Sequence, residues 1–213
     1  MTKTSSQELF NFDKQCRAAV IGTDEAGRGP GAGGVFAAAV YFNKITPGLI
    51  KDLEILNDSK KLSAVKRESI YDVILNNTIN KIVCIEVDEI EKLNILNSSL
   101  KAMNIACCEV IKRMGENNII TLVDGNKLIK NYSYPQQYII KGDSKSASIA
   151  AASILAKVTR DRYMQKLHEE YPMYNWAKNA GYLTKEHLCA IDKFGITKYH
   201  RPSYLKKHFA VNK

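Results

Sequence analysis

Val20-Ile21-Gly22-Thr23-Asp24-Glu25 is an apolar run that ends on two acids. Two later runs have the same form, Ile120-Thr121-Leu122-Val123-Asp124-Gly125 and Tyr138-Ile139-Ile140-Lys141-Gly142-Asp143. Apolar, β-branched segments bounded by turn residues predict strands. If the three strands share one sheet and the first runs parallel to the other two, their acids gather at one edge of that sheet.

The rest of the chain predicts further strands and several helices. Strands are expected at about 17–24, 34–42, 79–87, 119–124 and 137–142. Helices are expected from a Ser63 cap to about residue 76, over 95–114, over 146–171, and from a Thr184 cap to Gly195. This order indicates an α/β chain with its helices weighted to the C-terminal half, and 1–213 is interpreted as one domain with a helical, basic portion at about 172–213.

The charge balance favours a polyanionic partner. The 213 residues include 31 Lys and Arg against 22 Asp and Glu, a formal net charge of +9, and 193–213 contains no acid. Charge alone leaves a solvated basic tail as an equal alternative. Five cysteines without a Cys-x-x-Cys pair suggest neither a disulfide framework nor a zinc site. No leader or membrane-spanning stretch is evident, so a soluble, cytoplasmic protein is expected.

The acids at the strand ends favour a metal site. Clustered carboxylates repel one another, so protons or cations must compensate, and a set of oxygen donors alone selects Mg²⁺ or Mn²⁺. Beside a basic surface, such a site indicates phosphodiester chemistry. Each acid also has a structural explanation: Asp124-Gly125 as a turn, Asp143 as a cap near the Ser146 helix, and Asp24-Glu25 as a polar strand end. Three coincident strand ends favour a site.

Gly27-Arg28-Gly29-Pro30-Gly31 follows the first strand and has two interpretations. Gly27-x-Gly29-x-x-Ala32 formally fits the dinucleotide-binding fingerprint of an oxidoreductase, with Asp52 or Glu54 at the distance of a ribose contact. That motif must open a helix, whereas the segment after this loop is predicted as a strand. Glycines equally allow close approach of a sugar and phosphate, with Arg28 as a donor fork.

Gly22-Thr23-Asp24-Glu25-Ala26-Gly27-Arg28-Gly29-Pro30 resembles the opening signature of type 2 ribonuclease H. Further segments are similar to the family's motifs in the family's order: Asp58-Ser59-Lys60-Lys61-Leu62, Val123-Asp124-Gly125, Lys141-Gly142-Asp143 followed by 151–161, Gly181-Tyr182-Leu183-Thr184-Lys185-Glu186-His187, and His200-Arg201-Pro202-Ser203-Tyr204. The resemblance covers nearly all of 18–204.

The resemblance implies a fold and a set of site residues. The fold would be the ribonuclease H-like α/β fold, a mixed five-stranded sheet flanked by helices, with 172–213 closing over the substrate. Asp24, Glu25, Asp124 and Asp143 carry over as the catalytic, metal-binding acids. Gly27, Arg28 and Gly29 carry over as the loop that contacts the 2′-hydroxyl, the group that tells ribose from deoxyribose. Tyr182 would pack on the next sugar at an RNA–DNA junction, and Lys60 would contact a backbone phosphate.

The resemblance also implies an activity. The chain would be an endoribonuclease of DNA repair and replication that cuts RNA in RNA–DNA hybrids and single ribonucleotides embedded in duplex DNA. Cleavage on the 5′ side of the ribonucleotide, with two Mg²⁺ or Mn²⁺ ions, would leave 3′-hydroxyl and 5′-phosphate ends. A monomer with no membrane attachment and no protein partner is expected. The alternatives are a non-catalytic hybrid-binding protein and the dinucleotide-binding oxidoreductase.

Some residues fall outside these roles. Gly34 and Leu183 stand where the family usually has proline. The related type 3 enzymes share the acids but resemble this chain less, since they have an additional N-terminal domain and typically lysine in the glycine loop. Arg160, Asp161 and Arg162 are interpreted as a surface ion-pair group, and no catalytic role is assigned to His187 or His200.

Overall fold

The computed structural model describes residues 5–57 and 62–211. Its centre is a five-stranded sheet in the order β3-β2-β1-β4-β5, formed by β1 (Ala19–Ala26), β2 (Val35–Tyr41), β3 (Ile79–Ile85), β4 (Ile119–Asp124) and β5 (Gln136–Ile139). β2 runs antiparallel to both β1 and β3, whereas β4 runs parallel to β1 and β5. The mixed five-stranded sheet that the family resemblance implies is confirmed.

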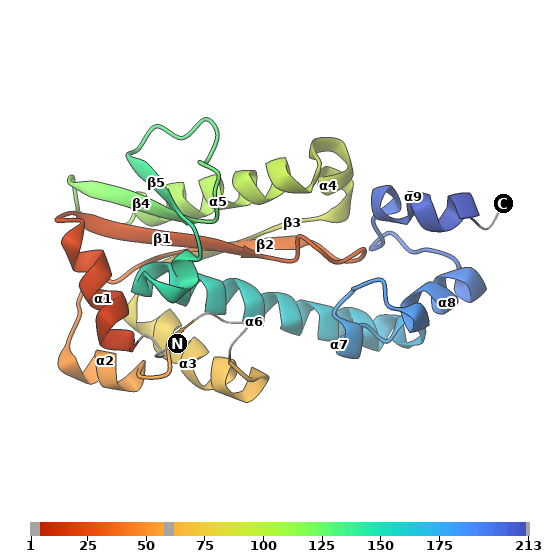
Figure 1. Ribbon diagram of the computed structural model, residues 1–213, viewed down its shortest axis with the longest axis horizontal. Coiled ribbons are helices and arrows are strands. Elements are labelled where there is room, and N and C mark those ends of the chain that lie inside the picture. The colour runs from red at the N-terminus through yellow and green to blue at the C-terminus, as the bar shows by residue number, and fades with distance from the viewer. Residues whose placement is uncertain (1–4, 58–61, 212–213) are drawn as a thin grey trace.

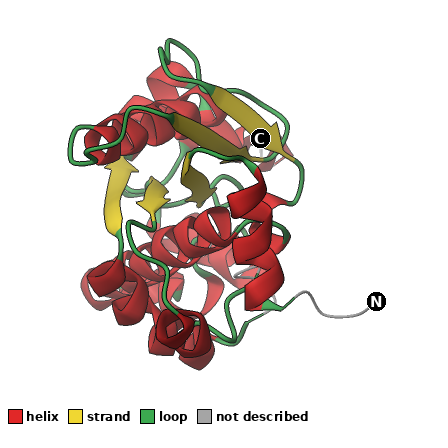
Figure 2. Ribbon diagram, turned by 90° about the vertical axis from the view of Figure 1, so that its left-hand side faces the viewer, coloured by secondary structure: helices red, strands yellow, loops and turns green. Residues whose placement is uncertain are grey.

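Helices cover both faces of this sheet (Figures 1 and 2). α4 (Val87–Leu93) and α5 (Ile95–Ile111) lie on one face, and α1 (Ser6–Gln15), α2 (Pro47–Asp52), α3 (Ala64–Asn77) and α6 (Ala147–Glu170) lie on the other. Beyond one end of the sheet lie α7 (Trp176–Asn179), α8 (Lys185–Phe194) and α9 (Pro202–Val211). No helix in 5–57 or 62–211 is long and apolar enough to cross a bilayer.

The predicted helix starts are confirmed by their caps. Ser63, Ser146 and Thr184 each accept a hydrogen bond from the backbone amide three residues later, which satisfies one of the free donors at a helix N-terminus. Gly195, with φ of 80°, ends α8 as expected. As predicted, α6 begins buried, with every side chain from 147 to 156 in the core, and finishes exposed.

Alternation along β2 builds two separate cores. Ala38 and Val40 face α6, whereas Ala37 and Ala39 face α5. β1 lies so close to the start of α6 that a Cβ added at Gly22 would be 2.1 Å from the carbonyl carbon of Ser148. This close approach places the first turns of α6 beside the acids that follow Gly22 on β1.

The predicted outline is wrong in three places. α1, α2, α4, α7 and α9 were not predicted; α2, α4 and α7 are short, whereas α1 and α9 are as long as the predicted α8. The strand expected to reach residue 87 ends at Ile85, and the chain turns into α4 at Glu86. The strand expected over 137–142 ends at Ile139, after which Lys141 has φ of 55° and Gly142–Ser144 forms a 3₁₀ turn. Asp143 therefore lies in that turn and not at a strand end.

Candidate active site

Asp24 and Asp124 lie side by side at one edge of the sheet. The parallel register pairs Thr23 of β1 with Val123 of β4, and each acid is the next residue on its strand. Asp124 Oδ1 accepts a hydrogen bond of 2.7 Å from the Gly142 amide. This bond draws the 3₁₀ turn, and with it the buried Asp143, toward the same edge. Asp24, Glu25 and Asp124 meet at the sheet edge as predicted, whereas Asp143 lies in the turn beside Asp124 and not at a strand end.

The electrostatics of this edge oppose a full set of negative charges. Burial raises the pKa of Asp24 well above its usual value, and the charges of Glu25 and Asp124 raise it further. Hydrogen bonds from Ser153 and from the Glu25 amide, the latter at 2.7 Å, act in the opposite direction on this pKa. A carboxylate in this position favours a proton or a cation beside it.

The donor set fits a hard divalent cation, because every candidate ligand is a carboxylate oxygen. As the side chains stand, however, no three Asp, Glu, His or Cys groups in the described residues converge closely enough to hold an ion. Glu25 is instead paired with Arg28, at 3.1 Å between Oε1 and Nη1. Metal binding would therefore draw Glu25 away from Arg28.

A cleft of about 270 Å³ joins two of the acids to the glycine loop and to Tyr182; its lining residues are Asp24, Glu25, Ala26, Gly27, Arg28, Gly29, Ser153, Lys157, Arg160 and Tyr182. The Tyr182 ring is 54% exposed and lies against the loop, since a Cβ added at Gly29 would be 3.2 Å from its Cε1. The residues predicted for sugar recognition are thus brought together. Lys60 lies outside the described residues.

The glycine loop leads into a strand and not into a helix. β2 begins at Val35, directly after the loop, so the helix that the dinucleotide fingerprint requires is absent at this place. At Gly27, φ is 101° and a Cβ would be 2.3 Å from Arg160 Nε, so only glycine fits. Among the described residues, the Arg28 and Gly29 amides donate to no acceptor, which leaves both N–H groups available to a ligand.

The prediction that Arg160 is a surface residue is wrong. Its guanidinium is buried behind the loop, where Nη2 donates to Ala32 O at 3.2 Å and to Ala180 O at 3.1 Å. Burial lowers the pKa of Arg160 to about 10, and the nearby charge of Arg201 contributes. Its neighbours Asp161 and Arg162 do form ion pairs, with Lys157 and Glu68.

Ser153, Lys157 and Arg201 also belong to the site or support it, but they were not singled out from the sequence. Ser153 and Lys157 line the cleft with Arg160 because these three recur at positions i, i+4 and i+7 on one face of α6. That spacing of polar residues in a helix with a buried first half was the signal available. Arg201, fully buried behind the loop, carried no such signal.

A buried aromatic cluster supports the C-terminal portion. Trp176 Nε1 donates to His187 Nε2 at 3.0 Å, and His187 Nε2 also lies 3.1 Å from His200 Nε2. His187 Nδ1 lies 2.9 Å from the Tyr182 carbonyl oxygen, so the cluster holds the backbone of Tyr182. Burial lowers the pKa of both histidines, that of His200 to about 4.

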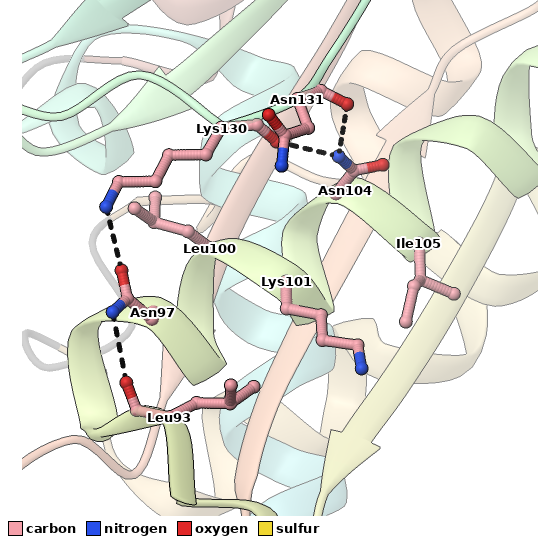
Figure 3. A pocket seen from close by; sticks show the side chains of 8 residues that line it. All are labelled: Leu93, Asn97, Leu100, Lys101, Asn104, Ile105, Lys130 and Asn131. Carbon is pink, nitrogen blue, oxygen red and sulfur yellow. Dashed lines mark hydrogen bonds between the residues drawn. The ribbon is translucent and has the colours of Figure 1, made fainter.

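A larger cavity of about 520 Å³ lies elsewhere, between α5 and the segment before β5 (Figure 3); it is lined by Leu93, Asn97, Leu100, Lys101, Asn104, Ile105, Lys130 and Asn131. The Asn104 amide spans it by donating to the carbonyls of Lys130 and Asn131. No carboxylate lines this cavity. Asp24, Glu25, the glycine loop and Tyr182 all border the smaller cleft, which is the candidate active site.

Comparison with known proteins places these features in a family context. The family model described as Ribonuclease HII matches residues 21–212. Ribonuclease HII of Fusobacterium nucleatum subsp. nucleatum is 47% identical over 97% of this chain and 94% of its own length. Ribonuclease HII of Pelagibacter ubique is 47% identical over 87% of this chain and 95% of its own length.

Solved structures agree with the fold. Ribonuclease HII from Archaeoglobus fulgidus, solved in complex with PCNA, superposes with a TM-score of 0.68 at 25% identity, covering 86% of this chain and 93% of that one. Bst-RNase HIII, solved in complex with Mn²⁺, gives a TM-score of 0.72 at 16% identity, over 98% of this chain and 72% of that one. The second likeness concerns the fold alone.

Proposed function

Because the chain belongs to the ribonuclease HII family, we propose that Asp24, Glu25, Asp124 and Asp143 are the acids with which it performs the family's reaction. The chain is a metal-dependent endonuclease that hydrolyses RNA in RNA–DNA hybrids and at ribonucleotides embedded in duplex DNA. The observation that supports these acids is the buried Asp24, whose pKa is raised by burial and by the charges of Glu25 and Asp124 beside the glycine loop.

The four acids would hold two ions, Mg²⁺ or Mn²⁺. When bound, such ions supply an activated water and neutralise the charge that develops on the scissile phosphate. The protein's part is to fix the acids on β1, on β4 and in the turn after β5, and to keep Asp24 buried where electrostatic interactions are strong. Cleavage on the 5′ side of the ribonucleotide then leaves 3′-hydroxyl and 5′-phosphate ends.

The cleft beside the acids would select the ribonucleotide. The Arg28 and Gly29 amides, which have no acceptor among residues 5–57 and 62–211, would donate to the 2′-hydroxyl, and the exposed Tyr182 would pack on the following sugar. Arg28, released from Glu25, and Lys60 would contact phosphates. The basic 172–213 portion would close over the duplex, whose phosphates attract its charge.

We also propose the substrates, the oligomeric state and the location of the chain. The substrates would be RNA–DNA hybrids and DNA duplexes that contain ribonucleotides, bound by a monomer without a protein partner. A cytoplasmic location in the service of DNA replication and repair would bring the chain to these substrates.

The test is a labelled DNA duplex with one embedded ribonucleotide, incubated with Mg²⁺ or Mn²⁺. Asp124→Asn is expected to lower the cleavage rate at least about 100-fold, because it removes one charged metal ligand. The matched control is Asp52→Asn, an exposed carboxylate on α2 that the oxidoreductase alternative would need for ribose binding. It should cut at the wild-type rate.

The outcomes separate the proposed function from its alternatives. Undiminished cutting by Asp124→Asn would refute the proposed site. Salt-sensitive duplex binding by the wild type without any cleavage would indicate the non-catalytic hybrid-binding protein. Binding of NAD without binding of DNA would indicate the oxidoreductase.

A further inference from the structure

Arg201 is a buried arginine that binds backbone carbonyls. Its side chain is 0% exposed, and no ion pair of Arg201 with a carboxylate occurs in the described part of the chain. The guanidinium donates instead to four carbonyl oxygens of the glycine loop: Gly27 at 2.8 Å, Arg28 at 3.3 Å, Pro30 at 2.8 Å, and Gly33 at 3.0 and 2.6 Å. Burying an unpaired charge is costly, so these bonds must be retained for the fold to hold the residue there.

Other C-terminal groups hold the loop from the same side. Tyr204 Oη donates to the Arg28 carbonyl at 2.7 Å, and the Arg201 amide donates to the Gly31 carbonyl at 2.8 Å. Arg201, just before α9, and Tyr204, in its first turn, thus hold the glycine loop. Arg201 and Arg28 are 173 residues apart in the chain.

Peptide geometry determines where the Arg28 and Gly29 amides point once the carbonyls of Gly27 and Arg28 are held in place. In a planar trans peptide, the carbonyl of one residue and the N–H of the next point in opposite directions. Arg201 holds the carbonyls of Gly27 and Arg28, which belong to the same peptide units as the N–H groups of Arg28 and Gly29. Fixing the two carbonyls on the Arg201 side therefore directs the two amides, which have no acceptor in the described part of the chain, away from Arg201.

We propose that Arg201 is the positioning residue for ribose recognition: it fixes the two peptide units whose amides receive the 2′-hydroxyl. The inference rests on the proposed function of the loop and deepens it. Arg201 does not itself touch the substrate. A lysine could not substitute, because its single ammonium cannot reach carbonyls that the planar guanidinium fork contacts simultaneously.

The test measures ribose preference by equilibrium binding in EDTA, where no cleavage occurs. Two labelled duplexes of one sequence are compared, one with a single ribonucleotide and one of DNA throughout. Arg201→Lys is expected to lose about tenfold of the wild-type preference for the ribonucleotide, the equivalent of one misplaced hydrogen bond. Its affinity for the all-DNA duplex should change less than about twofold, because phosphate contacts set that affinity.

The matched control is Arg162→Lys, the same substitution at an exposed arginine that pairs with Glu68. It should keep the wild-type preference. Tyr204→Phe removes one hydroxyl donor to the Arg28 carbonyl and should lose about threefold of the preference. This milder variant tests the same inference if Arg201→Lys fails to fold, which circular dichroism would reveal.

The failures of the two proposals are distinguishable. Unchanged preference in a folded Arg201→Lys, or in Tyr204→Phe if Arg201→Lys does not fold, would overturn the positioning role. Equal loss of affinity for both duplexes would also overturn it, because a merely structural residue would act in that way. Wild-type cleavage of the ribonucleotide duplex with Mg²⁺, measured in parallel, reports on the proposed function alone.

Discussion

At the scale of single residues, the charge of the buried Asp24 carboxylate destabilises the fold at neutral pH. The raised pKa means that folded Asp24 holds its proton more tightly than the unfolded chain does, so its contribution to stability is present at low pH and lost as pH rises through the folded pKa. Asp24→Asn is expected to raise Tm at neutral pH by about 2–4 °C for each 1 kcal/mol of repulsion removed, while cleavage is lost.

The measurement is thermal unfolding in EDTA at pH 7.5 and at pH 3.5, with Asp52→Asn as the control. The gain in Tm should shrink at the lower pH, where Asp24 is protonated in the folded state and mostly protonated in the unfolded chain. An Asp24→Asn chain that is less stable than the wild type at pH 7.5 would contradict this account of the site.

The sequence predicted the positions of Asp24 and Asp124 but not those of the buried arginines. Asp24 and Asp124 were predictable because each ends an apolar run, and strand register places both acids at one sheet edge. Arg160 was misassigned to the surface, since local sequence gives no sign that carbonyls from distant segments will surround a charge. The same holds for Arg201, whose partners precede it by about 170 residues.

At the scale of elements, α1 is fastened to α6 by one buried acid. Asp13 Oδ2 accepts hydrogen bonds from the Ser148 amide and from its hydroxyl, both at 2.8 Å. Asp13→Ala would leave two buried donors without a partner and is expected to lower the free energy of unfolding by roughly 1–3 kcal/mol. Urea unfolding followed by circular dichroism measures this loss. Lys14→Ala, an exposed neighbour on α1, should leave the midpoint unchanged, and an equal shift in both variants would refute the fastening.

The helices with a hydroxyl cap before a long apolar-periodic run were predicted, whereas α1 and α9, which are as long as α8, were not. Ser146 and Thr184 allowed the starts of α6 and α8 to be predicted, because a hydroxyl residue before an apolar-periodic run is a local sign of a helix N-terminus. α1 has such a cap at Ser5, yet only packing on α6 reveals what its buried face contacts. The turn at Gly142–Ser144 follows from contacts with Asp124 and Ile149, which lie outside the segment itself.

At the scale of the whole molecule, the C-terminal portion has a core of its own. This core contains residues of the C-terminal half of α6, Met164 and Leu167, together with Tyr174, Trp176 and Leu205. It is separate from the two cores of the sheet. This portion supplies both Tyr182 and Arg201, so the side of the cleft that we propose binds ribose depends on a core that the acids do not share. Conditions that loosen this core should affect Tyr182 and the glycine loop before they affect the acids.

Acid is such a condition, because His200 lies in that core. Its pKa is lowered from 6.5 to about 4, so the unfolded state binds more protons between these values and stability falls as pH drops from 6.5 toward 4, by about 3 kcal/mol at most. Trp176 is the one tryptophan of the chain and contacts His187 directly, so its fluorescence reports on this core while circular dichroism reports on all helices. The fluorescence midpoint in urea should fall with pH before the circular dichroism midpoint does. His200→Gln should flatten that dependence, and His168→Gln, a substitution on α6, should not. Coincident midpoints at every pH would show that the C-terminal core unfolds together with the cores of the sheet.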